Sequence, residues 1–356
     1  MKILVQHSKP TLGKEERDAI QSVIKSGWVA QGKAVERFED RLCEYIGLPC
    51  RQGVALSNGT TALYLALKLV GVKRGDEVIV PSYTCSAVLN AVCAAGAKPV
   101  LTDVDKNSFN ISYKFIKEKI TKKTKAIIVV HVFGVPADLE LMSNFSVPII
   151  EDCATALGSF MAQKHVGVSG DVAIFSFYAS KVITTGQGGM LVSKNSGYIK
   201  KARDYRQFDG RKVYYPRFNF QMTDLQAAMG VAQLGKLGVF LRKRKTIARS
   251  YASICRKKGW RFQCPDNKDF IPNWHRFVLN IEAKTVTKLK SYLRKQGIET
   301  IVPIERWELL HRYLRLDRRL FKNSESISQA TLSLPIYPGF VDESGFEKAI
   351  DIIDKF

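Results

Sequence analysis

The reactive side chain that the sequence singles out is a lysine between an apolar strand pattern and a glycine-rich turn. Lys181 follows the segment 176–180 (SFYAS) and precedes the segment 184–189 (TTGQGG). Most lysines are solvated surface charges, but a lysine held between a buried strand and such a turn is less easily assigned to the surface. A desolvated lysine amine forms Schiff bases with carbonyl groups. The pattern therefore favours a site in which the amine of Lys181 acts as a nucleophile.

An acidic pair comes directly after another apolar segment. Residues 147–150 (VPII) lead into Glu151 and Asp152, and the carboxyl ends of strands in α/β sheets are where ligands bind. A carboxylate there would keep a pyridinium nitrogen protonated, because a close opposite charge favours both ionised forms. The pair also fits an exposed loop, so both interpretations stay open on this motif alone.

Two further segments carry groups suited to phosphate binding. Residues 57–63 (SNGTTAL) predict a loop that opens an apolar helix, where free N–H groups and the helix dipole attract anions. A plain helix cap explains the same residues. Asn219, in the segment 217–224 (RFNFQMTD), just precedes another expected helix. By itself it also fits an ordinary loop amide.

The elements that must position these residues alternate between strand and helix patterns from about residue 50 to 195. A small-residue, apolar helix is expected at 86–95. Strands are expected at 77–83, 98–104, 125–132, 171–177 and 189–193. This rhythm predicts an α/β domain with a mainly parallel sheet covered by helices on both faces.

The second part of the chain has a different pattern. A long helix is expected to start near Thr223, since Thr223 and Gln226 fit a capping box. Beyond about residue 240 a basic helix is followed by a shorter α+β pattern. With 356 residues and roughly 150 residues per domain, we expect two domains: a large domain at 1–238 and a smaller C-terminal α+β domain at 239–356.

Bulk properties exclude several classes of protein. The net charge is +22, but the basic residues are spread along the chain outside any nucleic-acid-binding motif, so no nucleic-acid partner is expected. No apolar run approaches the roughly 20 residues of a membrane span, and the N-terminus lacks a signal-peptide pattern. Seven cysteines without CxxC spacing argue against zinc and disulfides. We expect a cytoplasmic protein with no metal.

Taken in order, these motifs resemble the DegT/DnrJ/StrS family of sugar aminotransferases, which have the aspartate aminotransferase-like fold type I. The resemblance covers nearly the whole chain, from 26–32 (SGWVAQG) through 75–81 (GDEVIVP) to 332–338 (LSLPIYP). It implies pyridoxal 5'-phosphate as cofactor. It also implies transfer of an amino group from an amino acid, with glutamate expected, to a keto-sugar. That sugar is expected to be nucleotide-linked, in amino-sugar and surface polysaccharide biosynthesis.

The resemblance assigns a role to each candidate residue. Lys181 would carry the cofactor, and Asp152 would pair with its pyridine nitrogen. Asn219 would reach the phosphate of the neighbouring subunit's cofactor, which implies a homodimer with shared active sites. The cofactor phosphate would be bound by Gly59, Thr60, Thr61 and Ser176.

Two positions depart from the family pattern. Thr155 stands where Gln or His usually approaches the cofactor's phenolic oxygen, and is counted with the cofactor-binding residues. Cys85 stands where an aromatic residue often stacks on the ring, and Tyr83 is an alternative neighbour for that ring. His131 and His311 are weaker candidates, because a satisfied core histidine and a solvated surface histidine, respectively, explain them at least as well.

Other functions remain open. Family members that dehydrate deoxysugars have histidine in place of this lysine, so Lys181 favours transamination. The same cofactor could still serve a non-nucleotide keto-sugar or dehydratase-type chemistry. A non-catalytic protein that reuses the fold is a second alternative, although both Lys181 and Asp152 are present. Nucleic-acid binding driven by charge is a third, and steep salt dependence of binding to any DNA would support it.

Overall fold

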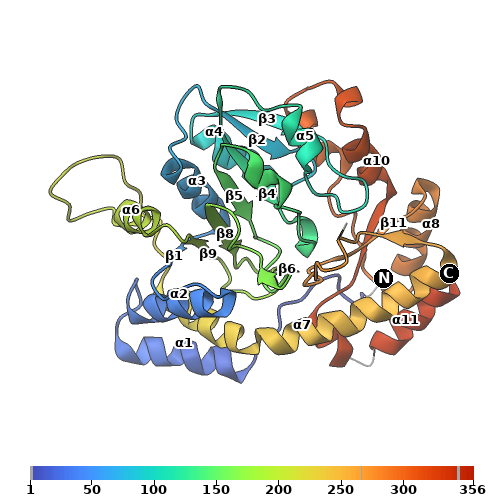
Figure 1. The fold of residues 1–356 in the computed structure, drawn as a ribbon. Helices are drawn as coiled ribbons and strands as arrows, with labels where there is room; N and C mark the ends of the chain where they lie inside the picture. Colours follow the sequence, from blue (N-terminus) through green and yellow to red (C-terminus); the bar gives the residue numbers. More distant parts are fainter. Residues whose placement is uncertain (1–2, 266, 343–344) are drawn as a thin grey trace.

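The computed structural model describes residues 3–265, 267–342 and 345–356, and its centre is a seven-stranded sheet. The strands are β1 (Gly53–Leu56), β2 (Glu77–Pro81), β3 (Lys98–Thr102), β4 (Thr124–Val130), β5 (Ile149–Asp152), β8 (Val172–Ser176) and β9 (Gly189–Val192). Their order is β1-β9-β8-β5-β4-β2-β3, as Figure 1 shows. Only β9 runs antiparallel to its neighbours, which confirms the mainly parallel sheet.

The strands are apolar along their whole length because helices cover both faces of the sheet. Alternate residues of β4 show this: Ile128 packs in one hydrophobic cluster and Ile127 in another. The first cluster includes side chains of α3 (Gly59–Leu69), α4 (Ser86–Ala94) and α6 (Ser196–Arg206). The second includes side chains of α2 (Lys33–Ile46), α5 (Tyr113–Lys117) and α7 (Asp224–Lys258). A further helix, α1 (Lys14–Ser26), packs against α7.

The long helix α7 begins as the sequence predicts. Gln226 N–H donates to Thr223 Oγ1 at 3.3 Å, and Gln226 Oε1 accepts from Thr223 N–H at 3.0 Å. The helix continues unbroken to Lys258, so its first half packs on the sheet and its second half on the C-terminal elements. Residue 238 therefore lies inside a helix, and the division at 238/239 stays a proposal.

The C-terminal elements surround a third hydrophobic cluster. An antiparallel sheet of β10 (Arg261–Phe262), β11 (Phe277–Asn280) and β12 (Thr331–Leu334) packs with α8 (Ala283–Lys295), α10 (Lys322–Ala330) and α11 (Gly345–Lys355). Val5 pairs with Ile298 and joins the same cluster, and Figure 1 shows the start of the described chain near the C-terminal helices. The first described residues thus pack with the last helices.

The remaining elements are short. They are β6 (Phe160–Met161), β7 (Lys164–His165) and α9 (Leu310–Tyr313), with 3-10 turns between the longer elements. None of the helices in the described ranges has the length and apolar character that crossing a membrane requires.

Candidate active site

A cavity of about 150 Å³ brings Lys181 and Asp152 together. Asp152 ends β5, and Lys181 lies in the turn between β8 and β9, so both come from the carboxyl edge of the sheet, where ligands of α/β folds bind. Cys85 and Thr155 line the same cavity, and the C-terminal part of the chain contributes His275 and Arg276 to its walls. The cavity is thus closed by both halves of the molecule.

The surroundings of Lys181 favour a reactive amine. Burial lowers the pKa of Lys181, and the positive charge of Arg276 acts in the same direction, while Cys85 and Asp152 oppose the shift. A larger fraction of the neutral amine is therefore present at a given pH than for an exposed lysine, and the neutral amine is the nucleophile.

Burial has the opposite effect on Asp152. It raises the pKa of this carboxyl group, and the hydrogen bond from Ala154 N–H (2.9 Å) and the charge of Lys181 oppose the shift. Among the described residues, Asp152 and Lys181 form no direct ion pair with each other. Both groups therefore remain available to a ligand that lies between them.

The turn that carries Lys181 is held by its own backbone. Phe177 N–H donates to Gly188 O at 2.9 Å, and Thr185 N–H donates to Phe177 O at 2.9 Å. The Phe177 side chain is fully buried and packs edge-on against Phe38, with ring centroids 5.0 Å apart. These contacts fix where the lysine enters the cavity.

The predicted phosphate site lies where α3 meets β8 and β9. A Cβ atom on Gly59 would lie 2.9 Å from Ser176 Cβ, and one on Gly189 would collide with the backbone oxygen of Asn58. Only glycine permits this approach, so the structure places Gly59 beside Ser176. A phosphate fits such a close meeting of a helix N-terminus, a hydroxyl and glycine backbone.

The start of α3 is also capped, which leaves fewer backbone N–H groups free to donate hydrogen bonds to a phosphate. Asn58 Oδ1 accepts a hydrogen bond from Thr61 N–H at 2.8 Å. The N–H group of Thr61 is therefore occupied, whereas those of Gly59 and Thr60 have no partner within the described chain. The cap and the phosphate site are compatible, and Gly59, Thr60 and Ser176 carry the proposed binding role most directly.

The departures from the family pattern have distinct structural outcomes. The Thr155 hydroxyl donates to His131 O at 2.9 Å, so in this arrangement it can only accept from a ligand. Cys85 lines the cavity. Tyr83 is fully buried and packs edge-on against Phe109 and Phe133. Tyr83 is not among the residues that line the cavity, and the alternative that it approaches the cofactor ring stays a prediction.

Asn219 lies apart from this cavity. Its side chain is exposed, and its Oδ1 accepts from Gln221 N–H at 3.3 Å. The next residue, Phe220, accepts through its backbone oxygen from Ser57 N–H at 2.8 Å, which places Asn219 near the loop before α3. Its expected role requires a second subunit.

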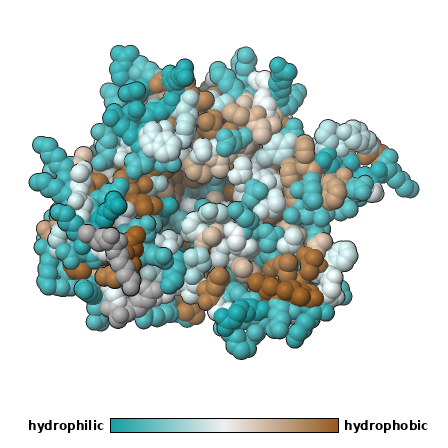
Figure 2. Space-filling view, turned by 180° about the vertical axis from the view of Figure 1, so that it is seen from behind, coloured by the Kyte–Doolittle hydropathy of each residue, from teal (hydrophilic) through white to brown (hydrophobic). Residues whose placement is uncertain are grey.

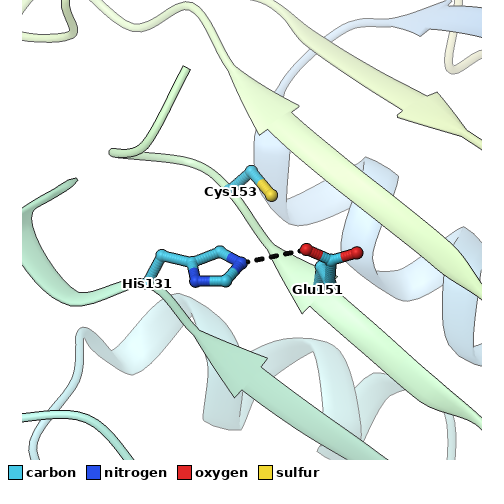
Figure 3. Close-up of side chains that lie close together, drawn as sticks. All are labelled: His131, Glu151 and Cys153. Carbon is cyan, nitrogen blue, oxygen red and sulfur yellow. Dashed lines mark hydrogen bonds and ion pairs between the residues drawn. The ribbon is translucent and has the colours of Figure 1, made fainter. Parts of the chain in front are cut away.

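His131 is a satisfied core histidine, as one of the two interpretations held. Its Nδ1 accepts from Ala137 N–H at 2.9 Å, so its protonated Nε2 donates to Glu151 Oε2 at 3.1 Å, as Figure 3 shows. Glu151 also accepts from three backbone N–H groups of the loop 167–170. Cys153 lies close enough to complete a metal-binding group, but these hydrogen bonds already occupy the histidine and the carboxylate.

The expectation that His311 is a solvated surface histidine is wrong. It is fully buried and stacks on Phe321, with ring centroids 4.4 Å apart. Its Nδ1 lies 2.6 Å from Ser82 Oγ and its Nε2 lies 3.0 Å from Glu325 Oε1. Burial alone would raise the pKa of Glu325, but hydrogen bonds led by that from Arg312 lower it to about 2. The network fastens the turn before Cys85 to the C-terminal part of the chain.

Two lining residues were missed from the sequence. His275 and Arg276 stand just before β11 and face the cavity. His275 Nδ1 and Arg276 Nη1 are buried without a hydrogen-bond partner in the described parts of the chain. A basic pair that directly precedes an apolar strand is the signal that marks them.

This fold and this pair of residues define a pyridoxal-phosphate-dependent transferase of fold type I. A lysine amine, a strand-end carboxylate and a glycine-lined helix start meet at the ligand edge of one sheet, and these groups suit the cofactor's carbonyl, ring nitrogen and phosphate. The chain belongs to the DegT/DnrJ/EryC1/StrS aminotransferase family, whose model matches residues 10–352.

Relatives agree with this assignment. The chain is 34% identical over 348 residues to GDP-perosamine synthase of Vibrio cholerae, with 94% of each chain covered. The crystal structure of the aminotransferase TlmJ from Streptoalloteichus hindustanus superimposes with a TM-score of 0.92 at 30% identity, covering 99% of this chain and 98% of that one. Helicobacter pylori PseC, an aminotransferase involved in the biosynthesis of pseudoaminic acid, gives 0.89 at 26% identity, covering 99% and 98%.

Proposed function

We propose that this protein transfers the amino group of an amino acid, with L-glutamate as the donor, to the keto group of a nucleotide-linked sugar. The observation that carries the proposal is the joint placement of Lys181 and Asp152 in one cavity. The Vibrio cholerae relative is named for a GDP-linked amino sugar, so a GDP-linked keto-sugar is the first acceptor to test.

The residues of the cavity divide the chemistry among them. Pyridoxal phosphate, when bound, supplies an electron sink for the reacting carbon. Lys181 Nζ would hold the cofactor and, once free, would take the proton from the α-carbon of the amino donor, a role usually worth about 10²- to 10⁴-fold in rate. Asp152 would keep the ring nitrogen protonated. The N–H groups of Gly59 and Thr60 and the Ser176 hydroxyl would bind the cofactor phosphate.

The protein is further proposed to act as a homodimer with shared active sites. The segment 207–218 stands out from the body beside α6, as Figures 1 and 2 show. It exposes Val213 (71%) and Tyr214 (89%), and Asn219 follows at its base. Large exposed apolar side chains on a projecting segment are typical of an interaction surface.

A second apolar surface lies nearby. Figure 2 shows a hydrophobic patch below this segment, in the part of the molecule where Figure 1 shows α1 and α2. Trp28 is 60% exposed and lines a hollow of about 650 Å³ together with residues of α1, α2 and α7. Because both surfaces lie on the same side of the molecule, one partner subunit would cover both. In such a dimer Asn219 would reach the partner's cofactor phosphate.

The cellular location and the surface charge fit this proposal. Cys43, Cys153 and Cys255 are buried free thiols, which suits a reducing compartment, and we propose the cytoplasm. The net charge of +22 attracts anions in general, including a nucleotide-sugar. Charge alone does not indicate a nucleic-acid partner, and none is proposed.

Product analysis tests the proposed reaction. The enzyme is incubated with pyridoxal phosphate, L-glutamate and a GDP-linked keto-sugar, and the products are followed by mass spectrometry. We expect equal amounts of 2-oxoglutarate and the amino-sugar nucleotide. Loss of a hydroxyl group without gain of nitrogen would instead indicate dehydratase chemistry. Amination of a free keto-sugar in preference to every nucleotide-linked one would support the non-nucleotide alternative.

A further inference from the structure

Gln233 is a buried polar side chain of α7 that contacts the turn carrying Lys181. Its side chain is almost completely buried, since the residue is 1% exposed. Its Oε1 accepts a hydrogen bond from Thr184 N–H at 3.2 Å, and Thr184 follows Lys181 by three residues. Burying an amide costs free energy unless its polar atoms are paired. The burial of Gln233 must therefore be explained by the groups that its amide joins.

The other end of this amide binds the N-terminal part of the chain. Gln233 Nε2 donates to Thr11 O at 2.9 Å and to Glu16 Oε1 at 2.8 Å. Glu16 is buried in the first turn of α1, where its Oε2 accepts from Gly13 N–H at 2.6 Å. Both N–H groups of the amide and its oxygen are thus paired, so the side chain has one defined orientation.

Thr184 connects Gln233 to both ends of the turn. The Thr184 hydroxyl donates to Phe177 O at 3.2 Å and accepts from Gly186 N–H at 2.9 Å, and the residue is itself buried. A shift of Thr184 would therefore displace the segment 177–186, in which Lys181 lies. Gln233 acts on the backbone of this segment, since it is not among the described residues that line the cavity.

A second glutamine of α7 holds the same turn further along the chain. Gln226 Nε2 donates to Gln187 O at 2.9 Å. Gln226 and Gln233 are seven residues apart, about two helical turns, so their side chains lie on the same face of α7. Gln226 is partly exposed, and water can replace its hydrogen bond. The contact of Gln233 is buried, so its loss would leave Thr184 N–H without a partner.

A purely structural role for Gln233 is the alternative. Gln233 would then serve only to join α1 to α7, which pack against each other. Glu16 makes such a link without touching the turn, because Lys236 Nζ lies 2.5 Å from Glu16 Oε1. Changes at Gln233 and at Glu16 should then have the same consequences. A role in positioning Lys181 predicts that they differ.

We propose that Gln233 is a positioning residue for Lys181. By holding Thr184 N–H, it sets the direction from which the lysine amine approaches the cofactor and the α-carbon of the amino donor. A displacement of about 1 Å at a reacting group can cost on the order of 10²-fold in rate, so a fixed turn is worth a buried amide. This inference rests on the proposed aminotransferase function.

The first test needs neither cofactor nor substrate. Gln233→Met replaces the amide by an apolar side chain of similar length, and hydrogen–deuterium exchange of the segment 181–188 is measured by mass spectrometry. Exchange of this segment should become about 10-fold faster, because Thr184 N–H loses its acceptor and one hydrogen bond is worth roughly that factor. Exchange of β4 and β5 should change much less.

The second test follows the lysine itself. Stopped-flow absorbance gives the rate at which pyridoxal phosphate becomes attached to Lys181, and steady-state kinetics give kcat and KM with L-glutamate. Gln233→Met should lower the attachment rate and kcat by on the order of 10- to 100-fold, with KM changed by no more than about 3-fold.

Gln233→Glu separates positioning from stability. It keeps an oxygen that accepts from Thr184 N–H, so the attachment rate and kcat should return to within about 3-fold of wild type. It also places a second buried carboxyl group beside Glu16, which should make the fold less stable than wild type. A purely structural role would instead make the less stable variant the slower one.

Glu16→Gln is the matched control. It removes the charge that pairs with Lys236 but leaves the contact between Gln233 and Thr184. It should lower the unfolding temperature while the attachment rate and the exchange of 181–188 stay near wild type.

Two results would overturn the proposal: equal exchange of 181–188 in wild type and Gln233→Met, or attachment slowed as much by Glu16→Gln as by Gln233→Met. If L-glutamate leaves the wild-type absorption intact, the proposed donor is wrong, and exchange and attachment still decide the role of Gln233. If Gln233→Met does not fold, Gln233→Asn, whose amide is one methylene shorter, replaces it.

Discussion

At the scale of single residues, the cavity shifts its acid and its base in opposite directions. Burial disfavours both charged forms, so it raises the pKa of Asp152 and lowers that of Lys181. A ligand with a positively charged ring nitrogen near Asp152 would lower the pKa of that carboxyl group again. A ligand carbonyl near Lys181 would react with the neutral amine that the lowered pKa of the lysine provides. Perturbed groups of this kind mark functional sites.

The lowered pKa of Lys181 has a direct kinetic consequence. The rate of cofactor attachment should rise with pH, because the neutral amine reacts, through an apparent pKa below the ordinary value of 10.5. Since Arg276 contributes to the lowering, Arg276→Gln should move the curve to higher pH. Stopped-flow absorbance measures both, and a wild-type curve centred at or above 10.5 would contradict this account.

Asp152 is tested by removing its charge alone. Asp152→Asn should lower kcat on the order of 10²- to 10³-fold, as loss of one preorganised electrostatic contact does, because an amide does not stabilise a protonated ring nitrogen. Asp138→Asn, a change of an exposed carboxylate, is the control. Steady-state kinetics with saturating cofactor give the result, and a kcat within a few-fold of wild type would exclude the proposed role.

The sequence indicated residues that sit in local motifs and missed those placed by tertiary packing. Lys181 and Asp152 follow apolar strands, so their place at the sheet edge could be inferred from pattern alone. Arg276 reaches the same cavity only because the C-terminal elements fold back onto the sheet. His311 was misjudged for the same reason, since its burial depends on Ser82 and Glu325, which are distant in the sequence.

At the scale of elements, two glycines set how closely α3 approaches β8 and β9. Gly189→Ala should destabilise the fold by about 1–3 kcal/mol, as overpacking does, and weaken cofactor binding, because a Cβ there meets the backbone of Asn58. Gly235→Ala in α7 is the matched control: no atom lies near its Cβ position, so it should stabilise by up to about 1 kcal/mol. Urea unfolding and cofactor titration measure both, and equal effects would refute the close approach.

A buried carboxylate ties neighbouring elements together. Glu151 joins the end of β5 to His131 and to the loop before β8, so Glu151→Gln should cost about 3 kcal/mol. Its pKa is lowered from 4.5, since hydrogen bonds from His131 and the loop outweigh burial. Its stabilisation is therefore complete above pH 4.5 and lost as the pH falls through the lowered pKa. Denaturant unfolding at several pH values should show the gap to wild type narrowing only under acid conditions.

Element types were predictable, but their directions and lengths were only partly so. Apolar runs such as that of β4 mark buried strands whatever their direction, so the antiparallel course of β9 left no trace in the pattern. The capping box at Thr223 fixed the start of α7. Its end was not visible, because the second half of the helix exchanges one packing partner for another without a break in helix-forming residues.

At the scale of the whole molecule, the candidate site is completed by contacts between distant parts of the chain. In the proposed homodimer, the projecting segment 207–218 would contact a second subunit, so that Asn219 completes the site of that subunit. Tyr214→Asp should shift light-scattering mass from dimer to monomer and weaken cofactor binding, because Asn219 would no longer reach the partner. Lys284→Asp makes the same change of charge at an exposed residue of α8, outside this segment, and is the control. A wild-type mass equal to one chain would contradict the shared site.

The most direct test of the central claim is the absorbance spectrum of the purified protein with pyridoxal phosphate, recorded beside Lys181→Ala. We expect a visible band from lysine-bound cofactor in wild type that is absent in the variant and is bleached by L-glutamate. A wild-type protein that takes up pyridoxal phosphate without such a band, or a band that survives in Lys181→Ala, would contradict the assignment of Lys181 as the residue that holds the cofactor.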